Sequence, residues 1–205
     1  MSPTATSLQD LYRNKLRMIY DAERQGLEAM PRMAQMARNP ELRQSIERHQ
    51  RETEEQVRRL EQVFQRLGQQ PEPLECRPLR AMVEEAQQVA AGIQDPHTLD
   101  AFIVSAAQAI EHHEIAEYGT ARSWAMQLDR SEEAELLQRT LDEEGMTDKV
   151  LTEIAERMVN ERAAKGAGAE REVPIGAARE GGAASGGAGG ARSTSTGAGD
   201  EASLP

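Results

Sequence analysis

The sequence has few aromatic residues and only one cysteine. Aromatic side chains make up 3% of the 205 residues, so a hydrophobic core must consist mainly of Leu, Ile, Val, Ala and the nine methionines. A core of this kind favours helices over strands, in which aromatic and β-branched residues usually dominate. Cys76 has no partner for an internal disulfide, which indicates a reducing compartment.

Long apolar segments and an excess of cations are also missing. No run approaches the roughly 18 apolar residues of a membrane-spanning helix, and the N-terminus lacks the basic-then-apolar pattern of a signal peptide. The net charge of −11 argues against nucleic-acid binding, which needs clustered Lys and Arg to replace counterions. We therefore expect a soluble cytoplasmic protein that has neither a membrane nor a nucleic acid as partner.

Glycine is infrequent before residue 163 and abundant after it. Of the 16 glycines, 11 lie in segment 163–205, which has too few hydrophobic side chains to offset the entropy lost on ordering. We expect this segment to be a disordered tail. Residues 1–6 are then a short extension, and residues 7–162 form the folded domain.

Apolar residues recur at the helical period along four long segments. Ser or Asn or Asp precedes these segments as a cap, and in two cases Pro follows at the first helical position. Pro31 lies inside the first segment and is expected to kink that helix without ending it. The helices predicted from these signals are 7–38, 40–67, 96–128 and 131–162, with a shorter one at 79–91.

The lengths of the connections predict the topology. The first two long helices follow each other almost directly, and two or three residues join the last two. Each pair is therefore an antiparallel hairpin. Roughly 26 residues join the two hairpins, enough to run back along a helix of about 42 Å. A bundle with short loops alone would not need this segment. We therefore predict an all-α, ferritin-like four-helix bundle with a long crossover that contains a short helix.

Acidic residues and one histidine interrupt the apolar faces of all four long helices. Taken singly, each is more simply a residue at the boundary of the core. Their depths agree, however: Glu23 lies 16 residues before Asn39 and Glu52 lies 13 after it, and Glu114 and Glu144 are about equally far from the last turn. Buried carboxylates that converge repel one another unless cations are present. We predict a site for two metal ions whose candidate ligands are Glu23, His49, Glu52, Glu111, Glu114, Glu144 and Asp148.

The segments that carry these residues resemble the YciE/YciF family of bacterial ferritin-like proteins. The resemblance covers about residues 7–160. Its motifs are Tyr20-Asp21-Ala22-Glu23, His49-x-x-Glu52-Thr53, Ala107-Gln108-Ala109-Ile110-Glu111-His112-x-Glu114 and Thr140-Leu141-Asp142-Glu143-Glu144-x-x-Thr147-Asp148.

The resemblance implies a stress-associated protein, often called a ferroxidase, with a di-iron or di-manganese carboxylate site and a homodimeric assembly. Glu23 and Glu111 would each supply one carboxylate, and Glu52 and Glu144 would bridge or cap the metals. The sequence departs from the wider Glu-x-x-His pattern, because His49 precedes Glu52 and Thr147 stands where a histidine is expected. An oxygen-rich site of this kind suits iron or manganese.

Two functions remain open from the sequence. The first is an oxidoreductase that oxidises Fe(II) or consumes peroxide, with O₂ or H₂O₂ as oxidant and no catalytic residues or organic cofactor beyond the metal ligands. The second is a non-enzymatic stress or interaction protein whose metal site is vestigial or empty. Basic residues opposite the carboxylates would favour the second function, and the apolar faces around Glu23, Glu111 and Glu144 contain none.

Overall fold

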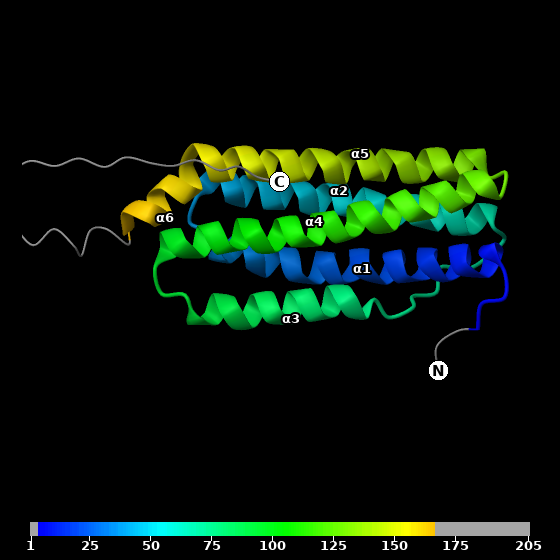
Figure 1. Ribbon diagram of the computed structural model, residues 1–205, viewed down its shortest axis with the longest axis horizontal. Coiled ribbons are helices and arrows are strands. Elements are labelled where there is room, and N and C mark those ends of the chain that lie inside the picture. Colours follow the sequence, from blue (N-terminus) through cyan, green and yellow to red (C-terminus); the bar gives the residue numbers. More distant parts are fainter. Residues whose placement is uncertain (1–3, 167–205) are drawn as a thin grey trace, which may run out of the picture. The chain divides into compact units, whose positions relative to one another are not determined.

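The computed structural model describes residues 4–166, and all regular elements in this range are helical (Figure 1). Four long helices build the bundle, and a shorter one lies in the crossover between the second and third of them. The elements are α1 (Leu8–Met36), α2 (Pro40–Arg66), α3 (Arg77–Gly92), α4 (Pro96–Gln127), α5 (Ser131–Ile154), the π-helical turn Ala155–Val159 and α6 (Asn160–Gly166). The fold is thus the expected all-α, ferritin-like bundle.

The helices begin where the sequence signals place them. Ser7 accepts a hydrogen bond from the backbone N–H of Asp10, and Asn39 caps α2 in the same way through Glu41 and Leu42. Asp95 accepts from the backbone N–H of Thr98 at the start of α4. These side chains satisfy N–H groups that have no partner within the first turn of a helix. Side-chain caps therefore fix the residues at which α1, α2 and α4 begin.

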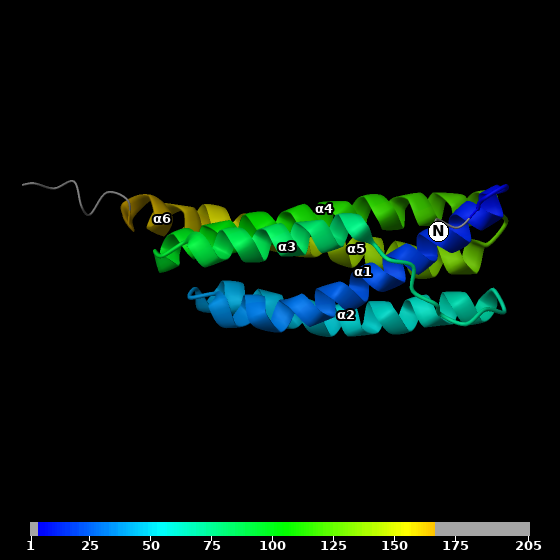
Figure 2. The same cartoon turned by 90° about the horizontal axis from the view of Figure 1, so that it is seen from below.

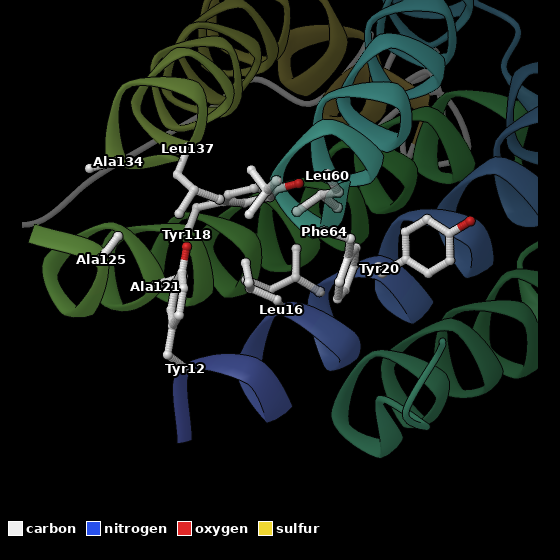
Figure 3. Packing of buried hydrophobic residues seen from close by; sticks show 12 residues of the cluster. Tyr12, Leu16, Tyr20, Leu60, Phe64, Tyr118, Ala121, Ala125, Ala134 and Leu137 are labelled. Carbon is white, nitrogen blue, oxygen red and sulfur yellow. The ribbon is translucent and has the colours of Figure 1, made fainter. Parts of the chain in front are cut away.

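The α1–α2 hairpin and the α4–α5 hairpin pack side by side, so that α1 lies against α4 and α2 against α5 (Figure 2). Each of the four helices contributes to two separate hydrophobic clusters. One cluster contains Tyr12, Leu16, Phe64, Tyr118 and Leu137 (Figure 3), and the other contains Met30, Leu42, Ile46, Ile103 and Leu151. Every long helix passes from one cluster to the other through a buried polar layer, which is where the candidate site lies.

The crossover runs along the outside of the bundle, where α3 packs against α1 and α4. Cys76 and Leu79 anchor its first turn against Ala22 of α1 in a small third cluster. The backbone N–H of Leu74 also donates to the carbonyl of Arg17 at 3.0 Å. The crossover thereby covers one side of α1 next to the polar layer.

One prediction about the helix lengths is confirmed, and another is corrected. Pro31 lies within α1, and the helix continues to Met36. The last helical run was expected to end near residue 162, but α6 extends to Gly166, so residues 163–166 are helical and do not belong to a disordered tail. The rest of that prediction, for 167–205, lies outside the described residues. Across 4–166, no helix has the length and apolar character required to cross a membrane.

Asp100, in the first turns of α4, closes the turn between α1 and α2. Its carboxylate accepts hydrogen bonds from the backbone N–H groups of Arg38 and Asn39 at 2.7 and 2.8 Å, and the residue is only 3% exposed. Because Asp100→Ala would leave these donors without an acceptor, we expect the free energy of unfolding to fall by about 3 kcal/mol. Urea denaturation measures this loss. Asp100→Asn, which keeps one acceptor, should lose less, and equal stability of wild type and Asp100→Ala would contradict the assignment.

Candidate metal centre

Four buried side chains from three helices converge in the polar layer. One ligand atom from each of His49 (α2), Glu111 and Glu114 (α4) and Glu144 (α5) lies within 4.8 Å of the others. We call these four residues the quartet. They are between 0% and 6% exposed, so the quartet is shielded from solvent by the bundle itself.

His49 directs one ring nitrogen toward the acids and the other toward α5. Its Nε2 atom lies 3.3 Å from Glu111 Oε1 and 3.7 Å from Glu144 Oε2. Its Nδ1 atom lies 3.2 Å from the Thr147 hydroxyl oxygen. Thr147, which stands where the wider pattern has a histidine, thus holds the imidazole in place instead of supplying a second one.

Glu144 is also held through its other carboxylate oxygen. The side-chain amide of Gln56 donates to Glu144 Oε1 at 2.5 Å and to Glu143 Oε2 at 3.2 Å. Both guanidinium NH₂ groups of Arg59 donate to Glu143 at 2.9 Å. Gln56 is fully buried and did not emerge as a candidate from the sequence, although it follows His49 by seven residues on the same helical face.

Glu23, from α1, lies beside the quartet and not within it. The Tyr118 hydroxyl donates a short hydrogen bond to Glu23 Oε1, and both residues are almost completely buried. Burial and the neighbouring Glu23 raise the pKa of Tyr118 well above its ordinary range. The hydroxyl group therefore keeps its proton and remains a hydrogen-bond donor.

Burial disfavours the charged form of every acid in this layer. It raises the pKa of Glu111 from 4.5 to about 8, with the charges of Glu114 and Glu23 adding to the effect. It raises the pKa of Glu23 to about 7, although the hydrogen bond from Tyr118 acts in the opposite direction. Burial and neighbouring carboxylates also raise the pKa values of Glu114 and Glu144 well above 4.5. Without a cation, the layer therefore holds several protons at neutral pH.

The pKa of His49 is shifted in the direction opposite to that of an isolated buried imidazole. Burial alone would lower the pKa of His49, but the nearby carboxylate of Glu52 and the charges of Glu144 and Glu23 raise it above 6.5. The same proximity to His49 lowers the pKa of Glu52, whose side chain is 36% exposed and lies 3.7 Å from Nδ1. Glu52 therefore lies at the solvent edge of the layer, outside the quartet.

Asp148, the remaining sequence candidate, faces a different set of partners. Its Oδ1 atom accepts a hydrogen bond from the Gln108 amide at 2.9 Å and lies 3.2 Å from His112 Nε2. His112 is exposed, and His113 lies 3.6 Å from the Cys76 thiol. The structure thus brings together four of the seven candidates, places Glu23 and Glu52 beside them, and turns Asp148 away.

The donor set fits a hard divalent cation. Glu111 Oε2 and Glu144 Oε2 are buried and accept no hydrogen bond from an N–H or hydroxyl group. Within residues 4–166, no Lys or Arg forms an ion pair with any quartet carboxylate. Three carboxylates and one imidazole are ligands typical of iron and manganese. A cation would supply the positive charge that this cluster lacks.

An apolar pocket reaches the quartet from the α1–α4 side. Its cavity volume is about 30 Å³, which is room for a molecule about the size of water. Side chains without hydrogen-bonding groups, including Met30, Ile46 and Leu151, form most of its lining, and His49, Glu111 and Glu114 form its polar end. Gly26 of α1 also lines the pocket. The pocket suits a small neutral molecule better than an ion.

The fold and the buried cluster define a ferritin-like helical bundle with a candidate carboxylate metal site. The chain belongs to the family described as Domain of unknown function (DUF892), whose family model matches residues 7–164. It is 34% identical over 158 residues to Protein YciF of Escherichia coli (strain K12), which covers 77% of this chain and 95% of that protein. The resemblance to the YciE/YciF family is thereby confirmed.

Solved structures agree with this assignment. The crystal structure of the E. coli stress protein YciF matches with a TM-score of 0.73 at 34% identity, over 76% of this chain and 99% of that one. YcfI from Rhodopseudomonas palustris also gives a TM-score of 0.73, at 39% identity, over 74% of this chain and 97% of that one. A protein from Xanthomonas campestris pv. campestris shares the fold with a TM-score of 0.64 at 22% identity, over 78% and 99% of the two chains.

Proposed function

We propose that this protein binds iron or manganese in its polar layer and oxidises Fe(II), with O₂ or H₂O₂ as oxidant, as part of a stress response. The observation that carries the proposal is the quartet, in which Glu111 Oε2 and Glu144 Oε2 are buried without a hydrogen bond and, within residues 4–166, no Lys or Arg pairs with a carboxylate. The E. coli relative is described as a stress protein, which supports the same physiological setting.

The residues of the polar layer have different roles in binding the cation. The Thr147 hydroxyl lies 3.2 Å from His49 Nδ1, so it would accept a hydrogen bond from Nδ1–H when the lone pair of Nε2 binds a cation. The quartet carboxyl groups release their protons as a cation binds, so binding strengthens as the pH rises. Bound Fe(II) would supply the electrons that reduce the oxidant. The apolar pocket gives a neutral oxidant a path to the quartet and keeps bulk water away.

Anaerobic titration with Fe(II) tests the proposal. We expect saturable binding by the wild type and, after addition of oxidant, Fe(III) formation faster than in a protein-free solution. His49→Ala removes the single nitrogen ligand of the quartet, and we expect the affinity for Fe(II) to fall at least about tenfold. His112→Ala is the matched control, because His112 is an exposed histidine on the bundle surface.

One observation favours a second candidate, a non-enzymatic stress or interaction protein. Burial raises the pKa values of Glu111 and Glu144, so both carboxyl groups can hold protons, and Tyr118 donates a hydrogen bond to Glu23; the layer can therefore persist without metal. The same titration decides between the two functions. Absence of saturable Fe(II) binding, together with oxidation no faster than in buffer, would favour the second.

A further inference from the structure

We infer that the polar layer holds one divalent ion tightly, at the quartet, and that hydrogen bonds from Tyr118 and Gln56 occupy the oxygens a second ion would need. The inference rests on the proposed function, since it concerns how many ions the same layer binds. It departs from the two-ion site that the sequence and its family resemblance suggest.

The side facing His49 has free ligand atoms. Glu144 Oε2 and Glu111 Oε2 are buried and accept no hydrogen bond from an N–H or hydroxyl group. His49 Nε2 lies 3.7 Å from Glu144 Oε2 and makes its other contact, at 3.3 Å, with Glu111 Oε1. With Glu114, these residues offer three carboxyl groups and an imidazole to a common centre. That set is enough to neutralise and coordinate one divalent cation.

The other oxygen of Glu144 is already satisfied. Glu144 Oε1 accepts the hydrogen bond from Gln56, whose amide is also tied to Glu143. Glu143 is fixed in turn by two hydrogen bonds from Arg59 at 2.9 Å. A cation that approached Glu144 Oε1 would meet the amide N–H group of Gln56, which already donates to this oxygen. Because Gln56 is fully buried, its amide cannot turn away into solvent.

Glu23 is satisfied in the same way. The Tyr118 hydroxyl donates to Glu23 Oε1, and the Tyr118 ring is packed among the hydrophobic side chains of α1, α2 and α5 (Figure 3). With 0% exposure, this ring has no space into which it could swing. Two neutral donors therefore occupy Glu144 Oε1 and Glu23 Oε1, the oxygens that a second cation would need.

Binding of Mn(II) alone tests the inference, by equilibrium dialysis with metal analysis and by electron paramagnetic resonance of the bound ion. We expect one tightly bound Mn(II) per chain, with the resolved hyperfine pattern of an isolated ion. Gln56→Glu replaces the amide by a carboxylate of the same shape, and Tyr118→Phe releases Glu23. Each should strengthen binding of a second Mn(II) by about tenfold or more. The two Mn(II) ions bound to either variant should then show a broadened, spin-coupled spectrum.

Gln65→Glu serves as the matched control, because Gln65 is an exposed glutamine on the same helix as Gln56 and should leave the stoichiometry at one. Two Mn(II) ions of similar affinity in the wild type would overturn the inference while leaving the proposed metal binding intact. A wild type that binds no Mn(II) or Fe(II) would overturn both. Since the wild-type stoichiometry is itself decisive, the outcome does not depend on either variant folding.

Discussion

Raising the pH from 5 to 9 is expected to lower the free energy of unfolding of the metal-free protein by several kcal/mol. The folded-state pKa values of Glu111 and Glu23, about 8 and about 7, lie above the value of 4.5 for an unperturbed Glu. The folded state therefore binds more protons than the unfolded state within this window, and stability falls as the pH rises. Since one pKa unit corresponds to about 1.4 kcal/mol, and the shift of Glu111 covers about three units within this window, Glu111 alone could account for about 4 kcal/mol.

Other groups do not reverse this trend. The pKa of His49 is raised above 6.5, so its contribution is also complete at low pH and lost as the pH rises. The pKa values of Glu52, Asp10 and Asp95 are lowered, and their contributions change only below the window. A loss of this size is a large part of the roughly 5–15 kcal/mol by which folded proteins are typically stabilised.

Urea denaturation in the presence of a chelator, at intervals from pH 5 to pH 9, measures the effect. A saturating concentration of Mn(II) should remove most of the loss, because the cation binds the deprotonated carboxylates of the folded state. Stability of the chelated protein that is constant or rises across this range would show that the four acids are not held in their protonated form.

The topology of the bundle could be predicted because it depends on lengths. The caps at Ser7, Asn39 and Asp95 define where helices begin, and the 26-residue connection leaves few ways of joining two hairpins. The π-helical turn at Ala155–Val159 could not be predicted in this way, since one extra residue in a turn does not interrupt the apolar pattern visibly. The helical run also continues four residues beyond the expected 162.

The candidate site was harder to resolve from the sequence than the fold. Positions three and four residues from a ligand lie on nearly the same face of a helix, and the neighbouring helices decide which of the two points inward. Thr53, four residues after His49, is buried, whereas Glu52, at three, lies at the solvent edge. On α5 the order is reversed: Thr147, three residues after Glu144, is buried, and Asp148 is not.

Gln56 and Tyr118 show a second limit of sequence reasoning. A glutamine or a tyrosine on an apolar face is compatible with simple packing, so neither residue signals a role toward the acids. Their importance depends on which oxygen of Glu144 or Glu23 each one reaches, and that geometry arises only when four helices are packed together. A charged residue on an apolar face is more informative, because burying it without a partner is costly.

Glu144→Gln is expected to abolish tight metal binding and, at the same time, to stabilise the metal-free protein at pH 8. The variant loses a carboxylate of the quartet, so the affinity for Mn(II) should fall by at least about 100-fold. Its amide oxygen can still accept the hydrogen bond from Gln56, and its NH₂ group can donate toward Glu111. Because one buried acid of the cluster is removed without loss of shape, the unfolding free energy should rise by about 1–3 kcal/mol.

Lost Mn(II) affinity together with increased stability would show that Glu144 binds metal and destabilises the metal-free fold. Glu135→Gln, an exposed substitution on the same helix, should change neither quantity and controls for the loss of one negative charge. Metal affinity is measured by isothermal titration with Mn(II), and stability by urea denaturation with a chelator at pH 5 and pH 8. The gain should be largest at pH 8, where the wild-type acids repel one another, and should shrink at pH 5, where they are protonated. If Glu144→Gln lost stability at pH 8 while binding Mn(II) like the wild type, Glu144 would be a structural hydrogen-bond partner of Gln56 and not a metal ligand.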